Sequence, residues 1–134
     1  MLPILLYGSE TWTLTARLRD LLDGTHTRLL RKCLDVHYRQ HMTNEALYGS
    51  LMSPSALVAE RRLRLAGHCI RADQPVADVL LWTAPGPQKV GRPPVLFPDL
   101  LCRAAQVVDR SELERLMSNR WQWKRVISNF SGLS

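Results

Sequence analysis

The sequence is short of lysine and of paired cysteines. Only three of its eighteen cationic side chains are lysine, the other fifteen are arginine, and twelve acidic residues leave a net charge of +6. Its three cysteines form an odd, widely spaced set, whereas a small secreted scaffold carries an even and dense one. The composition therefore favours a reducing compartment. It also favours a polyanionic partner, nucleic acid or anionic lipid, because the planar guanidinium grips phosphate at two points.

Long hydrophobic runs are absent too. The opening apolar run, residues 1–6, lacks a basic flank, contains Pro3, and is too short for a membrane span or a signal-peptide core. We interpret it as a core element whose N-terminal neighbour has been removed, and we expect no membrane partner. The 134 residues, 46% of them hydrophobic and 22% charged, are enough for one globular core.

Motifs for catalysis or cofactor binding are missing as well. There is no Asp-Asp pair for two-metal phosphoryl transfer, no nucleophile elbow and no phosphate-binding glycine loop. His37 and His41 have a metal-ligand spacing, but two histidines in a loop are a weak indication of zinc. The sequence therefore predicts a noncatalytic chain with neither metal nor cofactor.

Helical periodicity of the apolar residues predicts an all-α fold. Over residues 15–36 they recur at three- and four-residue steps, with Thr13 or Thr15 as the N-cap, and Gly24 in this segment permits a close helix crossing or marks a bend. Ser53 followed by proline starts a second long helix. Further helices are expected over 43–48, 76–82, 98–108, 111–118 and 120–130. We predict an irregular bundle of about five to six helices.

Proline and glycine are concentrated between residues 85 and 98. No helix interior tolerates such a composition, so residues 84–98 are predicted to be a linker. The predicted organisation is a helical region over 1–83, this linker, and a helical tail over 99–134 that packs on the first region.

A stripe of one charge sign runs along the second long helix. Arg61, Arg64, His68 and Arg71 fall within an arc of roughly 80°, opposite the apolar face of the helix. Guanidinium groups about 5 Å apart along an axis match the repeat of phosphates along a strand, which predicts binding of a nucleic-acid backbone. The alternative is an ordinary solvated helix face.

A weaker patch lies on the first long helix, where Arg17, Arg28 and Arg31 fall within roughly 60° of one another. Asp20 and Asp35 share that surface, which strengthens the solvated-face alternative. Near the C-terminus, Trp121 points away from the buried side of its helix and could pack at an edge or stack on a base.

Short sequence words, in order along nearly the whole chain, resemble the region after the palm of non-LTR, LINE-type retrotransposon reverse transcriptases. The words are Leu5-Leu6-Tyr7-Gly8-Ser9-Glu10-Thr11-Trp12-Thr13-Leu14-Thr15, Leu22-Asp23-Gly24, Thr27-Arg28-Leu29-Leu30-Arg31, Thr43-Asn44-Glu45, Leu47-Tyr48-Gly49, Glu60-Arg61-Arg62-Leu63-Arg64-Leu65-Ala66-Gly67-His68-Cys69, Leu81-Trp82, Gly91-Arg92-Pro93 and Asn119-Arg120-Trp121-Gln122-Trp123-Lys124. The family has Asp and Arg where this chain has Asn119 and Lys124, and its basic run near the linker is reduced here to Lys89 and Arg92.

The resemblance implies the thumb-like and tail region of an RNA-directed DNA polymerase. That region is helical and helps to hold the template and primer, whereas the catalytic aspartates belong to the palm. It implies the remainder of the reverse transcriptase as a protein partner, a nucleic-acid template-primer as ligand, and the nucleus as location.

Three alternatives stay open. The chain could be a helical protein-interaction module that docks on the polymerase palm, a nonfunctional transposon relic, or an autonomous enzyme. Self-association that is relieved by supplying the palm would favour the first, and nucleotide incorporation by the isolated chain would favour the last.

Overall fold

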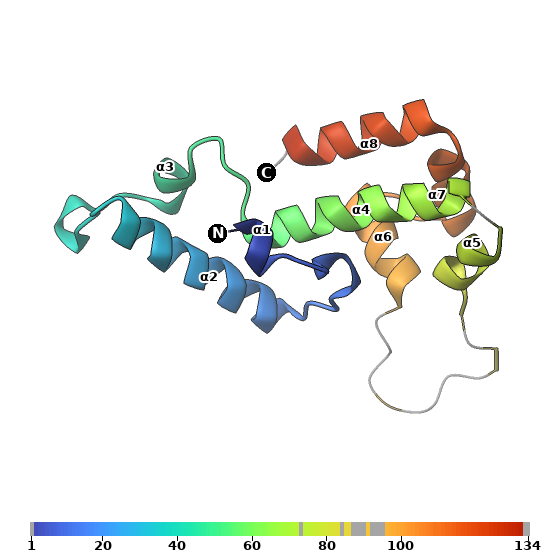
Figure 1. Cartoon of the computed structure of the whole chain (residues 1–134), viewed down its shortest axis with the longest axis horizontal. Helices are drawn as coiled ribbons and strands as arrows, with labels where there is room; N and C mark the ends of the chain where they lie inside the picture. The colour runs from blue at the N-terminus through green and yellow to red at the C-terminus, as the bar shows by residue number, and fades with distance from the viewer. Residues whose placement is uncertain (1, 73, 84, 87–90, 92–95, 133–134) are drawn as a thin grey trace. The chain divides into compact units, whose positions relative to one another are not determined.

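The chain is all-α, as predicted. A computed structural model describes residues 2–72, 74–83, 85–86, 91 and 96–132, and every regular element in these ranges is helical (Figure 1). Most of the predicted linker, 84–98, lies outside the described residues.

Two compact units make up the chain, Met1–Ala59 and Glu60–Leu133, and the division falls inside one long helix. The boundaries predicted from the sequence, which separate residues 1–83, 84–98 and 99–134, differ from this division. The predicted domains stay a prediction.

The first unit contains three α-helices and two 3₁₀ turns before that long helix. In chain order its elements are α1 (Leu2–Leu5), the 3₁₀ turn η1 (Ser9–Thr11), α2 (Ala16–Cys33), the 3₁₀ turn η2 (Tyr38–Gln40), α3 (Asn44–Tyr48) and the start of α4 (Pro54–Ala72).

Hydroxyl caps start three of these helices where the sequence predicts them. The side chains of Thr15, Thr43 and Ser53 each accept a hydrogen bond from the backbone N–H three residues on, at 3.3, 3.2 and 3.3 Å. Such caps satisfy backbone donors that the first helical turn leaves unpaired. Helix α2 ends at Cys33 rather than near residue 36, because Asp35 has a left-handed φ of 52° that a helix cannot continue.

Polar contacts connect the helices of the first unit. The Tyr48 hydroxyl of α3 lies 3.0 Å from His26 Nδ1 and 3.1 Å from the Thr27 hydroxyl, both on α2. The Asp23 carboxylate accepts hydrogen bonds from the Ser55 backbone N–H at 2.9 Å and from its hydroxyl at 2.6 Å. Asp23 of α2 thereby caps α4.

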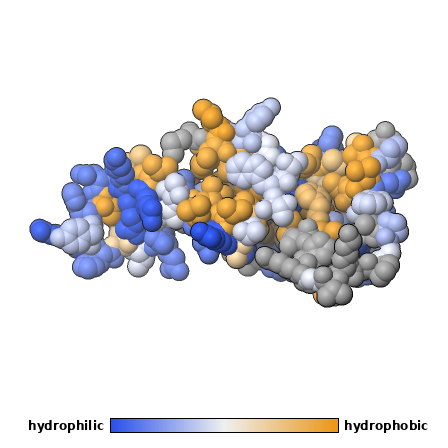
Figure 2. Space-filling view, turned by 90° about the horizontal axis from the view of Figure 1, so that it is seen from below, coloured by the Kyte–Doolittle hydropathy of each residue, from blue (hydrophilic) through white to orange (hydrophobic). Residues whose placement is uncertain are grey.

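Helix α2 also presents a surface groove. A hollow of about 520 Å³ is lined by Leu5, Trp12, Thr13, Leu14, Leu18, Leu21, Leu22, Thr25, His26 and Leu29. Leu21 is 62% exposed there. Figure 2 shows hydrophobic residues (orange) exposed beside hydrophilic ones (blue) on the face of the molecule that it views.

The second unit is built from the rest of α4 and four further helices: α5 (Gln74–Leu81), α6 (Phe97–Ala105), α7 (Arg110–Ser118) and α8 (Arg120–Gly132). Helix α6 packs against α5, α7 and α8, and α7 packs against α8. Helix α6 ends at Ala105 instead of residue 108 because Gln106 adopts a left-handed φ of 57°.

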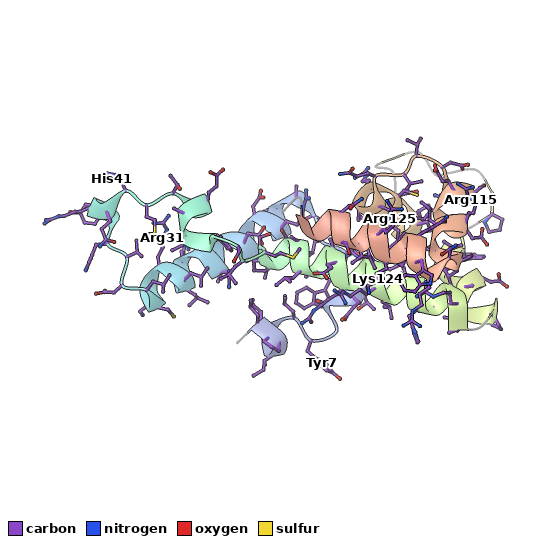
Figure 3. The ribbon with its side chains drawn as sticks, turned by 90° about the horizontal axis from the view of Figure 1, so that it is seen from above. Tyr7, Arg31, His41, Arg115, Lys124 and Arg125 are labelled. Atoms are coloured by element: carbon purple, nitrogen blue, oxygen red, sulfur yellow. The ribbon has the colours of Figure 1, made fainter. Side chains whose placement is uncertain are left out.

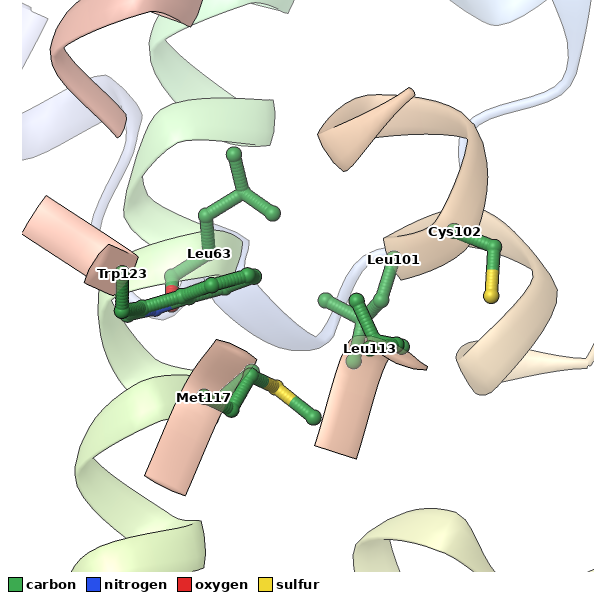
Figure 4. Packing of buried hydrophobic residues seen from close by; sticks show 7 residues of the cluster. Leu63, Leu101, Cys102, Leu113, Met117 and Trp123 are labelled. Carbon is green, nitrogen blue, oxygen red and sulfur yellow. The ribbon is translucent and has the colours of Figure 1, made fainter. Parts of the chain in front are cut away.

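One apolar core holds this second unit together. Its buried members are Leu63, Ala66, Leu101, Cys102, Leu113, Met117 and Trp123 (Figure 4). Val126, Ile127 and Phe130 of α8 pack against it half-buried, as their helical spacing predicts. The core fixes the side of α8 that faces α4.

Candidate functional site

The predicted arginine stripe lies on α4 and faces outward in part. Arg64, His68 and Arg71 are exposed, and Arg61 is half-exposed. Arg64 pairs with Glu60 one turn earlier, with its Nε 2.9 Å from Glu60 Oε1. The Glu60 side chain is only 12% exposed, whereas that of Arg64 is 66% exposed. Arg64 Nη2 donates to the same Glu60 oxygen, so the carboxylate orients the guanidinium and offsets part of its charge, while most of the side chain stays accessible to a ligand.

Arg71 is held in a different way. Its guanidinium Nη1 donates a hydrogen bond of 2.6 Å to the Met117 backbone oxygen, near the end of α7. No carboxylate of the described residues lies within ion-pair distance of Arg71. A neutral carbonyl orients the group without cancelling its charge, so Arg71 keeps its full attraction for an anion.

Four cationic side chains line one groove between α4 and α8. The groove has a volume of about 260 Å³, and its lining residues are Arg64, Arg71, Arg120, Trp123, Lys124, Ile127 and Ser128. Figure 3 shows Lys124 projecting from the side of α8 that lies next to α4. The groove thus combines a positive rim, a hydroxyl and an apolar floor, a combination suited to a phosphate group and its attached sugar.

The structure brings together only half of the predicted stripe. Arg64 and Arg71 line the groove, whereas Arg61 and His68 lie on α4 outside it. Sequence reasoning did not single out Arg120 and Lys124 as binding residues. The available signal was that residues 120–132 contain three cations and no acidic residue. Their position opposite Arg64 depends on how α8 packs, which spacing along the chain does not reveal.

Arg62, which lies between Arg61 and Arg64 in the sequence, has a structural role. It is 6% exposed, and its guanidinium carbon lies 5.7 Å from the centre of the Phe97 ring. Burial lowers the pKa of Arg62 from its ordinary value, because desolvation disfavours the charged form. This cation stabilises the contact between α4 and α6 and is not available to a ligand.

The three members of the second predicted patch differ in their contacts. Arg17 and Arg28 are exposed on α2, but Arg31 is half-buried. Arg31 Nη2 donates hydrogen bonds to the Met42 backbone oxygen at 2.7 Å and to Asn44 Oδ1 at 3.0 Å. In Figure 3, Arg31 points from α2 toward the segment that leads into α3. Arg31 therefore holds this segment through two neutral acceptors, which leave its charge in place, whereas Arg17 and Arg28 are exposed.

No group of three or more His, Cys, Asp or Glu residues lies close enough to hold a metal ion in the part of the chain that the structure describes. His37 Nε2 lies 3.8 Å from Asp35 Oδ1, and both side chains are exposed. Among the described helices, none has the length and apolar character needed to cross a membrane.

The groove brings four cationic side chains of the described residues together, and this lining suits an anion. Comparisons of the chain with protein-family models, with curated proteins and with solved structures find no match.

Proposed function

We propose that the chain is a noncatalytic helical segment of a non-LTR retrotransposon reverse transcriptase, and that it binds the backbone of a nucleic-acid template-primer. The observation that carries this proposal is the groove lined by Arg64, Arg71, Arg120 and Lys124. Cations from two helices meet there, with one carboxylate, Glu60, paired to one of them. The net charge of +6 and the ordered sequence words support the same conclusion.

Backbone binding follows from the chemistry of the groove. Arginine forks and a lysine ammonium contact phosphate oxygens and release the counterions condensed on the strand. Such contacts carry little sequence information, so binding is sequence-indifferent and falls steeply with salt. Arg61 and His68, on the same helix, extend the contact along α4. The partners are the strand itself and the remainder of the reverse transcriptase, and the location is the nucleus.

Filter binding with an RNA–DNA hybrid, a DNA duplex and single strands tests the proposal. We expect the double charge reversal Arg61→Glu and Arg64→Glu to weaken binding to all ligands by at least about tenfold, because two attractive contacts become repulsive. The control matched for net charge is Arg19→Glu with Arg39→Glu, two exposed arginines of the first unit. Unchanged binding in the double variant would refute the site.

A second candidate function is a helical protein-interaction module, and the apolar groove on α2 favours it. Leu18 and Leu21, neighbours on one face of α2, are 46% and 62% exposed there, and contiguous exposed apolar side chains mark interaction sites. The occupant would be the polymerase palm of the same polyprotein. This function predicts self-association of the isolated chain, measured by analytical ultracentrifugation, that disappears when the palm is added.

A further inference from the structure

Trp121 is an exposed aromatic residue on the helix that supplies two groove cations. It is 77% exposed, whereas Trp123, two residues on, is 2% exposed and belongs to the core. The packing of Trp123 and the hydrogen bonds from the backbone N–H groups of Trp121 and Gln122 to Asn119 Oδ1, at 3.1 and 3.2 Å, fix the first turn of α8. The indole of Trp121 therefore extends into solvent from a helical turn whose backbone is held in place.

Cationic side chains flank this indole. Lys124 and Arg125 stand three and four residues after Trp121, so they are its neighbours on the helix surface. Figure 3 shows Lys124 and Arg125 projecting from different sides of α8, and Trp121 lies between their directions on the helical wheel. Helix α8 contains no acidic residue. The surface thus joins an aromatic face to the positive groove through Lys124.

An aromatic face beside a phosphate-binding groove is the arrangement that binds single strands. Bases in a duplex are covered by their neighbours, whereas an unpaired base can leave its stack and lie on an indole. We propose that Trp121 stacks on an unpaired base while the groove holds the adjacent backbone, so that this surface prefers single-stranded nucleic acid over a duplex. This inference rests on the proposed function and names its substrate class.

The test compares Trp121→Ala, Trp121→Phe and the control Trp82→Ala by fluorescence anisotropy of labelled oligonucleotides. Trp82 is a second exposed tryptophan of the same unit, at 64% exposure. We expect Trp121→Ala to weaken single-strand binding about five- to hundredfold and to leave duplex binding within about twofold. Trp121→Phe retains most of the affinity, and Trp82→Ala has no effect.

A strand with abasic sites provides an independent measurement, since it keeps every phosphate and loses the bases. The wild-type chain should bind it about as weakly as Trp121→Ala binds the normal strand, and the variant should not distinguish the two strands. If Trp121→Ala loses equal affinity for single strand and duplex, or loses none, the stacking role is overturned. Salt-dependent binding by the wild-type chain would still support the proposed function in that case. If the wild-type chain binds no nucleic acid, both are overturned.

Discussion

The indole of Trp123 lies directly over Gly67. Trp123 Nε1 donates a hydrogen bond of 2.9 Å to the Leu63 backbone oxygen, so the ring crosses α4 at the one position without a side chain. A Cβ built on Gly67 would overlap the indole ring of Trp123. This contact sets the separation of α4 and α8 and therefore the width of the cationic groove.

Adding one methyl group at this contact should destabilise the second unit. We expect Gly67→Ala to lower the free energy of unfolding by about 1–3 kcal/mol, because the buried indole must shift. Urea denaturation measures the change. Gly24→Ala is the matched control: a Cβ at Gly24 meets nothing within 4 Å, so the substitution should raise stability by up to about 1 kcal/mol. Equal effects at the two glycines would contradict the close approach.

Ser9 is fully buried, and its hydroxyl has no hydrogen-bond partner among the described residues. Replacing it with alanine should leave the free energy of unfolding unchanged or raise it by about 1 kcal/mol, because an unpaired buried hydroxyl is unfavourable. The contrasting variant is Ser55→Ala, which removes a 2.6 Å hydrogen bond to the Asp23 carboxylate and should destabilise by about 1.5–3 kcal/mol. Thermal denaturation of both variants checks the difference in sign.

The three cysteines should differ in reactivity. Cys33 is exposed, Cys69 is half-buried and Cys102 is buried. Burial raises the pKa of the Cys102 thiol, so its reactive thiolate forms only at higher pH. We expect alkylation near pH 8, followed by mass spectrometry, to modify Cys33 first and Cys102 last. Early modification of Cys102 would contradict its place in the core.

The raised pKa of Cys102 also makes the free energy of unfolding depend on pH. The folded state favours the neutral thiol, so the contribution of Cys102 is fully present below the unfolded pKa of about 8.5 and is lost as the pH rises through the folded value. Cys102→Ala should therefore unfold with a weaker pH dependence above about pH 8 than the wild-type chain. Urea denaturation of both proteins at pH 7 and pH 9.5 measures this difference. An identical pH dependence in the two proteins would contradict a raised pKa at Cys102.

Arg31 should act on local order more than on nucleic-acid binding. Arg31→Ala removes two hydrogen bonds, to Met42 and Asn44, and should speed amide hydrogen exchange in α3. Arg28→Ala, an exposed neighbour on α2, is the control and should leave that exchange unchanged. Loss of nucleic-acid binding in Arg31→Ala, with normal exchange in α3, would instead support the patch predicted from the sequence.

Local sequence signals predict the helices well because their causes are local. Thr15, Thr43, Ser53 and Asn119 cap helices with their own side chains, and each is recognisable from its neighbours in the chain. The helix ends at residues 33 and 105 are less predictable, because they depend on left-handed conformations of Asp35 and Gln106, residue types that also occur within helices.

The candidate site is predictable only in part, because it depends on contacts between distant segments. Helical spacing places Arg64 and Arg71 on one side of α4, but it does not show that Arg120 and Lys124 lie opposite them. Nor does it show that Arg31 is committed to Met42, eleven residues away. The interior position of Arg62 likewise follows from its contact with Phe97.

The salt dependence of binding tests the central claim most directly. For the wild-type chain and for Arg120→Ala with Lys124→Ala, dissociation constants for a single strand would be measured from low to physiological salt. We predict that the logarithm of the binding constant of the wild type falls steeply with the logarithm of the salt concentration. In the double variant the slope should be shallower by about 0.7 for each phosphate contact removed, and circular dichroism should show that the fold is retained. Identical slopes in the two proteins, or binding that is insensitive to salt, would contradict a phosphate-binding groove between α4 and α8.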